Sequence, residues 1–249
     1  MNRFVDKTVL VTGGNSGIGL ATAIQYAKEG ARVVITGRDQ ATLEQAKVLI
    51  GANTIALKND QGNIHAAAQL ADMLGQQGIK LDAIFINAGV AKFAPFQDVD
   101  EALWDQTFNV NVKGAYFTIQ ALTPLLNRGA AIVLNGSINA HIGMPTSSVY
   151  AASKAALISF AKTLSAELLP LGVRVNVVSP GPVSTPLYGR LGMDSAQLEQ
   201  MAKSIQEQIP LNRFGTSEEL ASTVLFMSSA DSAFIVGTEL IADGGMSQL

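Results

Sequence analysis

Short apolar runs alternate with longer amphipathic segments along nearly the whole chain. Seven of these runs are short and rich in Val, Ile, Leu and Ala, which is typical of buried parallel strands. The predicted strands are Lys7–Thr12, Arg32–Thr36, Thr54–Lys58, Leu81–Asn87, Ala130–Gly136, Arg174–Ser179 and Glu239–Ala242. The predicted helices are Gly17–Glu29, Gln40–Ile50, Asn63–Gln76, Glu101–Leu126, Ser148–Leu169 and Ser217–Ser229, with a short helical stretch near Ser195–Gln208.

This alternation predicts an α/β fold, because strands joined through helices form a parallel sheet with right-handed crossovers. We expect a Rossmann-type doubly wound sheet of about seven strands, with helices on both faces. No linker rich in Pro, Ser or Gly divides residues 1–249, so we predict a single domain. In such a sheet a cofactor binds at the carboxyl ends of the strands, where the strand order reverses.

Composition narrows the classes of function. Hydrophobic residues make up 48% of the chain and charged residues 15%, which favours a buried α/β sheet over disorder. No apolar run reaches the length of a membrane span, and the N-terminus lacks the apolar stretch of a signal peptide, so we predict a cytoplasmic protein without a membrane partner. The net charge of −3 without a basic cluster argues against nucleic acid. With no Cys and two scattered His, we predict no metal site.

A glycine loop follows the first predicted strand. The segment Thr12–Gly19 reads TGGNSGIG and leads directly into a predicted helix. Glycines at 13, 17 and 19 permit a tight turn and let backbone N–H groups approach a pyrophosphate, and the helix N-terminus adds partial positive charge. Placed between a strand and a helix, the loop predicts a dinucleotide site rather than a plain turn.

Tyr150 and Lys154 form the second candidate feature. They are four residues apart in the predicted helix Ser148–Leu169, so their side chains share a helix face. An ammonium group beside a phenol favours the phenolate, so we expect Lys154 to lower the pKa of Tyr150 and make it a usable general acid or base. Ser137 lies thirteen residues before the tyrosine at the end of a predicted strand, where its hydroxyl can bond a substrate oxygen. Taken alone, the Tyr–Lys pair is also compatible with chance.

Together these features resemble the short-chain dehydrogenase/reductase family over essentially the whole chain. The loop has the spacing G-x-x-x-G-x-G, and Ser137, Tyr150 and Lys154 match the catalytic positions of the family. The other matching segments are INAG at 86–89, NVNVKG at 109–114, SPGPVSTP at 179–186 and DGG at 243–245. Two positions depart from the family pattern. Ile86 replaces an asparagine, and Gly136 replaces the usual serine before Ser137, which is expected to reshape the pocket floor.

The resemblance implies roles for further residues. Asn111 would be the fourth catalytic residue, anchoring a water that links Lys154 to solvent, and Lys154 would also hold the nicotinamide ribose. Asp60 would bind the adenine amino group, with a local turn as the alternative, and Thr185 would bond the carboxamide, with a turn hydroxyl as the alternative. Asn87 either caps a strand end or borders the cofactor. The full predicted cofactor set is Gly13, Asn15, Ser16, Gly17, Ile18, Gly19, Gly37, Arg38, Asp60, Asn87, Ala88, Gly89, Tyr150, Lys154, Pro180, Gly181, Val183 and Thr185.

The sequence says less about the substrate pocket than about the cofactor site. The segment Pro182–Pro210 breaks the strand–helix rhythm, and the resemblance implies that it is a mobile substrate loop. The candidate substrate residues are Ser137, Asn139, Met144, Tyr150, Leu187 and Tyr188, with Ile138, Val183 and Met193 as further lining residues. Their composition predicts a mostly apolar pocket.

The end of the second predicted strand bears on the choice of cofactor. NAD-binding chains usually place an acidic side chain there to bind the adenosine ribose. Here Gly37 leaves room and Arg38 follows, and a guanidinium can bind a 2′-phosphate through two parallel hydrogen bonds. We therefore expect NADP(H) to be preferred over NAD(H). The alternative is that Arg38 is a solvated loop residue.

The sequence thus predicts an NADP(H)-dependent oxidoreductase of the carbonyl reductase type, which interconverts a small-molecule carbonyl and a secondary alcohol. One alternative is an NAD-dependent dehydrogenase of a sugar, polyol or secondary alcohol. A second is a catalytically silent nucleotide sensor, which would be expected to lose the tyrosine or lysine. We also expect a homotetramer by resemblance, because residues 148–169 carry only three charged side chains, Lys154, Lys162 and Glu167.

Overall fold

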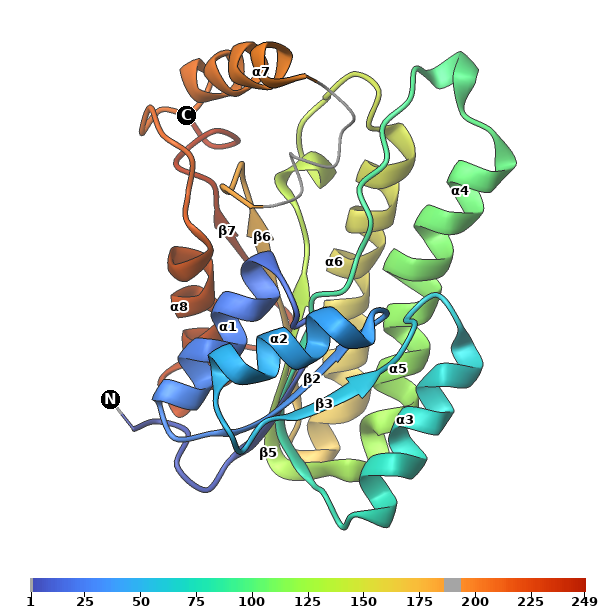
Figure 1. The fold of residues 1–249 in the computed structure, drawn as a ribbon, viewed down its shortest axis with the longest axis vertical. Coiled ribbons are helices and arrows are strands. Elements are labelled where there is room, and N and C mark those ends of the chain that lie inside the picture. The colour runs from blue at the N-terminus through green and yellow to red at the C-terminus, as the bar shows by residue number, and fades with distance from the viewer. Residues whose placement is uncertain (1, 186–193) are drawn as a thin grey trace.

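The seven predicted strands all form and lie side by side in one parallel sheet (Figure 1). The structure, a computed structural model, describes residues 2–185 and 194–249. The strands are β1 Thr8–Thr12, β2 Arg32–Gly37, β3 Ile55–Lys58, β4 Leu81–Ile86, β5 Leu126–Asn135, β6 Arg174–Pro180 and β7 Glu239–Ala242. Their order is β3-β2-β1-β4-β5-β6-β7, which confirms the predicted doubly wound sheet.

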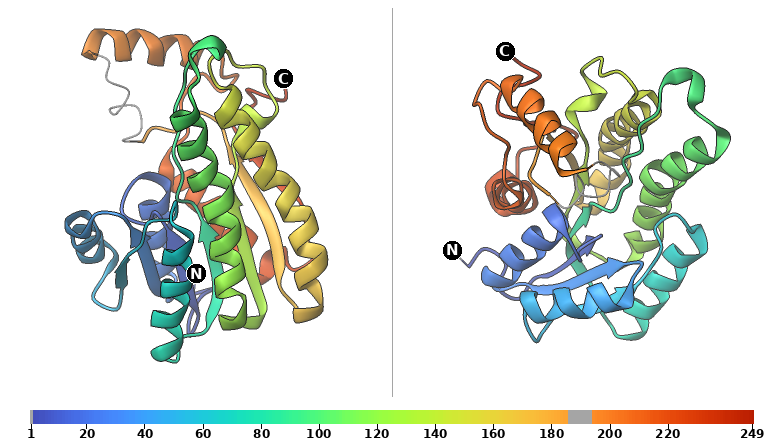
Figure 2. Two further views of the ribbon diagram at one scale, coloured as in Figure 1. Left: turned by 90° about the vertical axis from the view of Figure 1, so that its right-hand side faces the viewer. Right: turned by 45° about the horizontal axis from the view of Figure 1, so that its top comes forward.

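Helices cover both faces of the sheet (Figure 2). The main helices are α1 Gly17–Lys28, α2 Gln40–Ile50, α3 Ile64–Gln76, α4 Glu101–Phe108, α5 Ala115–Leu122, α6 Ser148–Leu168, α7 Ser195–Glu207 and α8 Ser217–Ser228. One buried core unites the sheet with α1, α2 and α8, and a second unites it with α3, α5 and α6. Helix α7 lies apart from both layers, at one end of the molecule (Figure 1).

Strand β1 shows why the strands are almost entirely apolar. Val9 and Val11 belong to the core under α1, whereas Leu10 between them belongs to the core on the opposite face. Successive strand residues point to opposite faces, so a strand covered on both sides needs apolar residues at every position. The amphipathic helices each bury one side against the sheet, so a layer of helices covers each of its faces.

The predicted helix Glu101–Leu126 was wrong as one continuous element. Helix α4 ends at Phe108, a π-helical turn spans Asn109–Gly114, and α5 follows to Leu122 before a 3-10 turn at Thr123–Leu125. Strand β5 therefore begins at Leu126 rather than at Ala130, and its register with β4 shifts between Leu81 and Ala83. The π-helical turn carries Asn111, which is 1% exposed, so the sequence pattern is interrupted where a polar side chain turns inward.

The strand order reverses between β1 and β4, which lie side by side at the centre of the sheet. The chain leaves their carboxyl ends toward opposite faces, and this divergence opens a crevice in doubly wound folds. Thr12 joins the two strand ends, because its Oγ1 accepts hydrogen bonds from Asn87 N (3.0 Å) and Ala88 N (2.9 Å).

Candidate functional site

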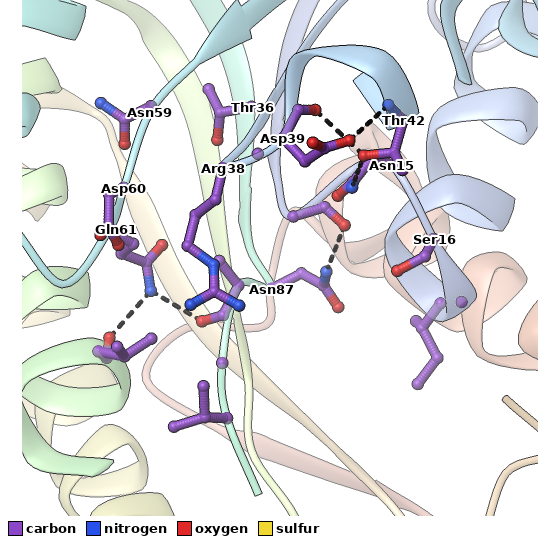
Figure 3. Close-up of a pocket in the computed structure, with 18 of the residues that line it drawn as sticks. Asn15, Ser16, Thr36, Arg38, Asp39, Thr42, Asn59, Asp60, Gln61 and Asn87 are labelled. Carbon is purple, nitrogen blue, oxygen red and sulfur yellow. Dashed lines mark hydrogen bonds between the residues drawn. The ribbon is translucent and has the colours of Figure 1, made fainter. Parts of the chain in front are cut away.

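A cavity of about 630 Å³ opens at this switch point (Figure 3). The lining residues are Gly13, Asn15, Ser16, Gly17, Ile18, Thr36, Gly37, Arg38, Asp39, Thr42, Asn59, Asp60, Gln61, Asn87, Ala88, Gly89, Val90, Val110 and Thr185. Twelve of them belong to the predicted cofactor set, which the structure thus brings together from five segments of the chain. The volume of the cavity falls within the usual range of ligand sites.

The glycine loop forms a cradle at one wall of the cavity. Gly13 and Gly17 have φ angles of +64° and +53°, in the left-handed region that glycine adopts without strain. A Cβ at Gly19 would collide with the carbonyl of Gly13. Ser16, which precedes α1, makes no side-chain capping bond, so the first N–H groups of the helix stay available to an anion.

Hydrogen bonds fix this cradle to the segment after β4. The Asn87 Nδ2 donates to the carbonyl oxygens of Thr12 (3.0 Å) and Gly13 (3.2 Å). The Asn87 Oδ1 in turn accepts from the Asn135 Nδ2 at 3.0 Å. Asn87 therefore braces the loop, which agrees with a role at the border of a cofactor more through shape than through chemistry.

Polar side chains gather around Arg38 at the end of β2. In the view of Figure 3 the Arg38 side chain extends away from the strand and ends between Gln61 and Asn87, while Asn15 lies beside Thr42. The Asn15 Nδ2 donates to the Thr42 Oγ1 at 2.9 Å. The exposed Asp39 caps α2, accepting from the Thr42 backbone N–H at 2.8 Å, and this bond lowers the pKa of its carboxyl group.

Asp60 lies on the opposite wall, after β3. Its Oδ1 accepts from the backbone N–H of Gly62 at 3.0 Å, which closes a local turn. Both roles considered for this residue are therefore geometrically compatible, since it forms the turn and also lines the cavity.

Tyr150 and Lys154 lie one turn apart on α6, as the spacing predicted. The Lys154 Nζ stands 5.6 Å from the centroid of the Tyr150 ring and donates to the carbonyl oxygen of Asn135 at 2.7 Å. Ser137 follows β5, and its Oγ accepts from the Asn139 backbone N–H at 3.2 Å. The side chains of 137, 150 and 154 therefore meet where β5 ends beside α6.

The expected electrostatics of the Tyr–Lys pair need correction. Burial raises the pKa of Tyr150 above 10.0, and a hydrogen bond with Ser137 opposes this rise only in part. Burial also lowers the pKa of Lys154 from 10.5 to about 8. The sequence-based expectation counted the charge of the ammonium but not the desolvation of both groups, and desolvation disfavours each charged form.

Asn111 adjoins this pair. Its Oδ1 accepts from the Val90 N–H at 2.8 Å, and its Nδ2 donates to the Val90 carbonyl at 2.9 Å and to the Ser153 Oγ at 3.1 Å. A Cβ at Gly89 would stand 3.2 Å from the Asn111 Oδ1 and 3.6 Å from the Lys154 Nζ. Since Gly89 also lines the cavity, the cavity adjoins Asn111 and Lys154, two of the four predicted catalytic residues.

Comparison with known proteins identifies the family. A family model described as enoyl-(acyl carrier protein) reductase matches residues 13–247. The oxidoreductase asL5 of Sarocladium schorii is 35% identical over 251 residues, covering 100% of this chain and 99% of that protein. The chain belongs to the short-chain dehydrogenase/reductase family. Family membership makes it an oxidoreductase and implies a nicotinamide cofactor.

Two further relatives of this short-chain dehydrogenase/reductase support the assignment. A cyclopentanol dehydrogenase of Comamonas sp. is 32% identical over 250 residues, with 98% of each chain covered. A solved structure described as a short chain dehydrogenase/reductase family protein has a TM-score of 0.86 at 40% identity, and the match covers 99% of this chain and 100% of the other.

Several predicted residues lie outside the cavity wall of this short-chain dehydrogenase/reductase. Leu187, Tyr188 and Met193 fall outside the described residues. The described members of the predicted cofactor set that do not line the cavity are Gly19, Tyr150, Lys154, Pro180, Gly181 and Val183. Gly181 packs against the backbone of Asp243, where a Cβ would not fit.

The departure at Gly136 has a steric reason. A Cβ there would collide with the Ser179 Oγ, so the strand end has no room for the serine of the family pattern. Ser179 is fully buried, and its hydroxyl has no hydrogen-bond partner among the described residues. At the end of β5, Gly136 therefore packs directly against the buried hydroxyl of Ser179.

Sequence reasoning missed part of the site. The unforeseen cavity residues are Thr36, Asp39, Thr42, Asn59, Gln61, Val90 and Val110. Phe93 was also missed, although its ring lies 5.6 Å from that of Tyr150 at 64° and is 37% exposed. Its segment is tied to the loop before α6 by the bond from Ala94 N to the Thr146 carbonyl at 3.0 Å. The one sequence signal for Phe93 was its place four residues after Gly89, close to the end of the matching segment 86–89.

Within residues 2–185 and 194–249, no three His, Asp or Glu side chains gather in a way that could hold a metal ion. In the same ranges no helix combines the length and apolar character needed to cross a membrane.

Proposed function

We propose that this chain is an NADP(H)-dependent carbonyl reductase that interconverts a carbonyl and a secondary alcohol. The observation that carries the proposal is the contact between the two halves of the site. Gly89 lines the cavity and lies beside both Asn111 and Lys154, so a cofactor held by the glycine cradle would end next to Tyr150 and Ser137.

The cavity residues fit a dinucleotide. The left-handed glycines and the uncapped N-terminus of α1 suit a pyrophosphate, because they present N–H groups and partial positive charge to it. Asp60 would hold the adenine, Asn87 to Gly89 would border the middle of the cofactor, and Thr185 would hold its carboxamide end. Pro180, Gly181 and Val183 would support that end from behind the cavity wall. When bound, the nicotinamide supplies or accepts a hydride.

The chain's own groups handle the proton and the carbonyl. In the reductive direction Tyr150, whose raised pKa keeps it protonated at neutral pH, donates its proton to the carbonyl oxygen. Ser137 positions and polarises that oxygen through its hydroxyl. Lys154 holds the nicotinamide ribose and, with Asn111, supports the proton supply to Tyr150. In the oxidative direction Tyr150 accepts the proton.

The preference for NADP(H) rests on the groups around Arg38. Its side chain lines the cavity (Figure 3), and Gly37 before it places no acidic side chain there. The neighbouring Asp39 carboxylate accepts from the Thr42 backbone N–H, so its charge faces the partial positive charge at the N-terminus of α2. Asn15 and the Thr42 hydroxyl add neutral polar groups at the same place. The alternative remains an NAD-dependent dehydrogenase of a sugar, polyol or secondary alcohol.

The substrate class we propose is a carbonyl compound with an apolar group next to the reacting carbon. Phe93 and Met144 are 37% and 42% exposed, and Ile138 adjoins Ser137 in the chain. Asn139 lies between these apolar groups and Ser137, with its Nδ2 3.4 Å from the Met144 Sδ. Residues 182–210 would form the substrate loop of a single-domain enzyme, with Leu187 and Tyr188 in contact with substrate.

We also propose a cytoplasmic homotetramer. The exposed positions of α6 include Ala152, Ala155 and Ala166, which allow close approach of another helix. On α4, Trp104 is 47% exposed and stacks on Phe108. Light scattering at micromolar concentration should give a mass well above that of one 26.1 kDa chain. A single-chain mass would refute the tetramer.

The function is tested by a panel of ketones, acyl thioesters and sugars, assayed in both directions with both cofactors. We expect NADPH-dependent reduction of an apolar ketone and the reverse oxidation of its alcohol. Turnover of sugars or polyols with NAD as the better cofactor would favour the first alternative. Cofactor binding without turnover of any class would favour a silent nucleotide sensor.

A further inference from the structure

Gln61 makes contacts that the mechanism above does not use. It follows β3, lines the cavity and is 6% exposed. Its Nε2 donates to the carbonyl oxygen of Ala88 at 2.7 Å and to that of Val110 at 3.1 Å (Figure 3). These carbonyls belong to two different segments, the one after β4 and the π-helical turn 109–114, so one amide group connects three parts of the chain.

The orientation of this amide is fixed by its partners. Both acceptors are backbone carbonyls, so only the NH₂ end of Gln61 can face them. The opposite atom, Oε1, is buried and has no hydrogen-bond partner among the described residues. A buried acceptor without a partner is costly, and the side chain adopts this position nevertheless. The two bonds donated by Nε2 therefore determine the position of the Gln61 side chain, although Oε1 is left without a partner.

Gln61 also contacts the π-helical turn through its main chain. A Cβ at Gly114, the last residue of the turn, would collide with the carbonyl of Gln61. Residue 61 thus touches the turn at two points, through its side chain at Val110 and through its backbone at Gly114. A π-helical turn departs from regular α-helical bonding, so outside contacts of this kind help to hold it.

Asn111 lies in the same turn and makes a parallel connection. It binds both backbone groups of Val90, while Gln61 binds Ala88 in the same segment. Two amide side chains therefore join the turn to the segment 87–90. Gln61 does so on the cavity side, and Asn111 does so on the side of Ser153 and the catalytic residues.

We propose that Gln61 is a positioning residue for Asn111. It holds the turn 109–114 against the segment 87–90, and this fixes Asn111 and Gly89 beside Lys154. The wall of the cofactor cavity and the proton supply to Tyr150 are then parts of one hydrogen-bonded unit. The kinetic consequence of this inference rests on the proposed function, whereas its structural consequence does not.

A double-mutant cycle tests the kinetic part. Gln61→Met keeps the length of the side chain and removes both donors, so kcat should fall about 10- to 100-fold as Asn111 loses its position. In an Asn111→Leu background the same substitution should have no further effect on kcat. A loss that persists in full in that background, or an unchanged kcat for Gln61→Met, would overturn the proposal.

Gln25→Met is the matched control. Gln25 also donates one side-chain bond, to the Ser222 Oγ at 3.0 Å, and its Oε1 likewise has no partner among the described residues. It lies on α1 at its contact with α8, where it touches neither the turn nor the segment after β4. The kcat of Gln25→Met should match that of the wild type.

Hydrogen exchange tests the structural part without any turnover. The Val90 amide donates to the Asn111 Oδ1, so its exchange should accelerate in Gln61→Met while exchange in α8 stays unchanged. Unchanged exchange at Val90 would overturn the proposal. If the wild type reduced no carbonyl, the proposed function would fail, and this measurement would still decide the role of Gln61.

Gln61→Glu extends the test should Gln61→Met fail to fold. A protonated carboxyl can donate one of the two bonds, whereas the ionised form can donate none and faces two carbonyl oxygens. The kcat of this variant, relative to the wild type, should therefore rise as the pH falls. The same ratio at every pH would show that the donated bonds do not matter.

Discussion

At the proposed cofactor end of the site the glycine loop and the N-terminus of α1 offer open backbone groups, whereas at the proposed catalytic end the side chains of Lys154 and Asn111 are already paired. Ser16 leaves the N-terminus of α1 without a side-chain cap, while Lys154 donates to Asn135 and Asn111 uses its whole amide. The two ends should respond differently to mutation. Changes at the catalytic end should alter rate and ionisation, and changes at the cofactor end should alter affinity and cofactor choice.

The helices that begin near the cavity also differ in whether a side chain caps their N-terminus. Helix α2 begins with a side-chain cap from Asp39, as α3 does from Asn63, and neither N-terminus is left open. Helix α1 begins at the glycine loop without such a cap. Helix α6 also lacks a side-chain cap, so it is the glycine loop together with the uncapped N-terminus of α1 that indicates where an anionic ligand is expected.

The largest expected effect is the loss of rate in Tyr150→Phe. The ring and its edge-to-face contact with Phe93 remain, but the proton donor is gone. We expect kcat to fall by about 10²–10⁴ while the dissociation constant of NADPH is unchanged. Steady-state kinetics and fluorescence titration measure the two quantities. A kcat within tenfold of the wild type would remove Tyr150 from the role of general acid.

The next effect concerns stability, in Lys154→Met. Burial lowers the pKa of Lys154 to about 8 in the folded protein, against 10.5 in the unfolded chain. The unfolded chain therefore binds more protons between these values, so the wild type gains stability as the pH rises from 8 to 10.5 and is penalised fully below 8. Removing the charge should raise the free energy of unfolding at pH 7 by up to about 3 kcal/mol, less the lost bond to Asn135.

Urea unfolding at pH 7 and pH 10.5 measures this difference. The gain of Lys154→Met should shrink toward zero at the higher pH, while its activity is lost at both. A variant less stable than the wild type at pH 7 would show that the charge of Lys154 is compensated in the folded protein.

At the cofactor end the expected effect is a change of preference in Arg38→Leu. Loss of one charge-assisted contact should reduce the NADPH-to-NADH ratio of kcat/KM about 10- to 150-fold. Arg32→Leu is the control, since Arg32 is exposed at the opposite end of the same strand. The variant keeps Gly37, because a Cβ at this position would stand 3.0 Å from the Asn15 Oδ1. An unchanged ratio would make Arg38 a solvated loop residue.

The contrast between the two ends also explains what the sequence could predict. The glycine loop and the Tyr–Lys pair are local patterns, so the spacing predicted a tight turn at Gly13 and Gly17 and a shared helix face for Tyr150 and Lys154, whereas their roles came from the family resemblance. Strand positions followed from apolar runs that are buried on both faces. These features need no knowledge of distant contacts.

The missed features depend on contacts across the chain. At the break at 109–114 Asn111 bonds with Val90 and Ser153, and a helical pattern in the sequence does not report such partners. The contacts of Gln61 join the end of β3 to the segment after β4 and to the π-helical turn 109–114, so they depend on the folded structure and cannot be read from the sequence. The pKa of Tyr150 was misjudged for the same reason, since desolvation is a property of the packed structure.

The smallest expected effect is a bend in the pH profile of the wild type. The kcat/KM for NADPH reports groups of the free enzyme. Tyr150 stays protonated well above neutral pH, so carbonyl reduction should be level until Lys154 begins to lose its charge near pH 8 and should decline above it. Lys154→Arg separates the two groups, because a guanidinium keeps its charge throughout this range. Its residual activity should show no bend near pH 8, and a bend at the same pH in this variant would assign the titration to another group.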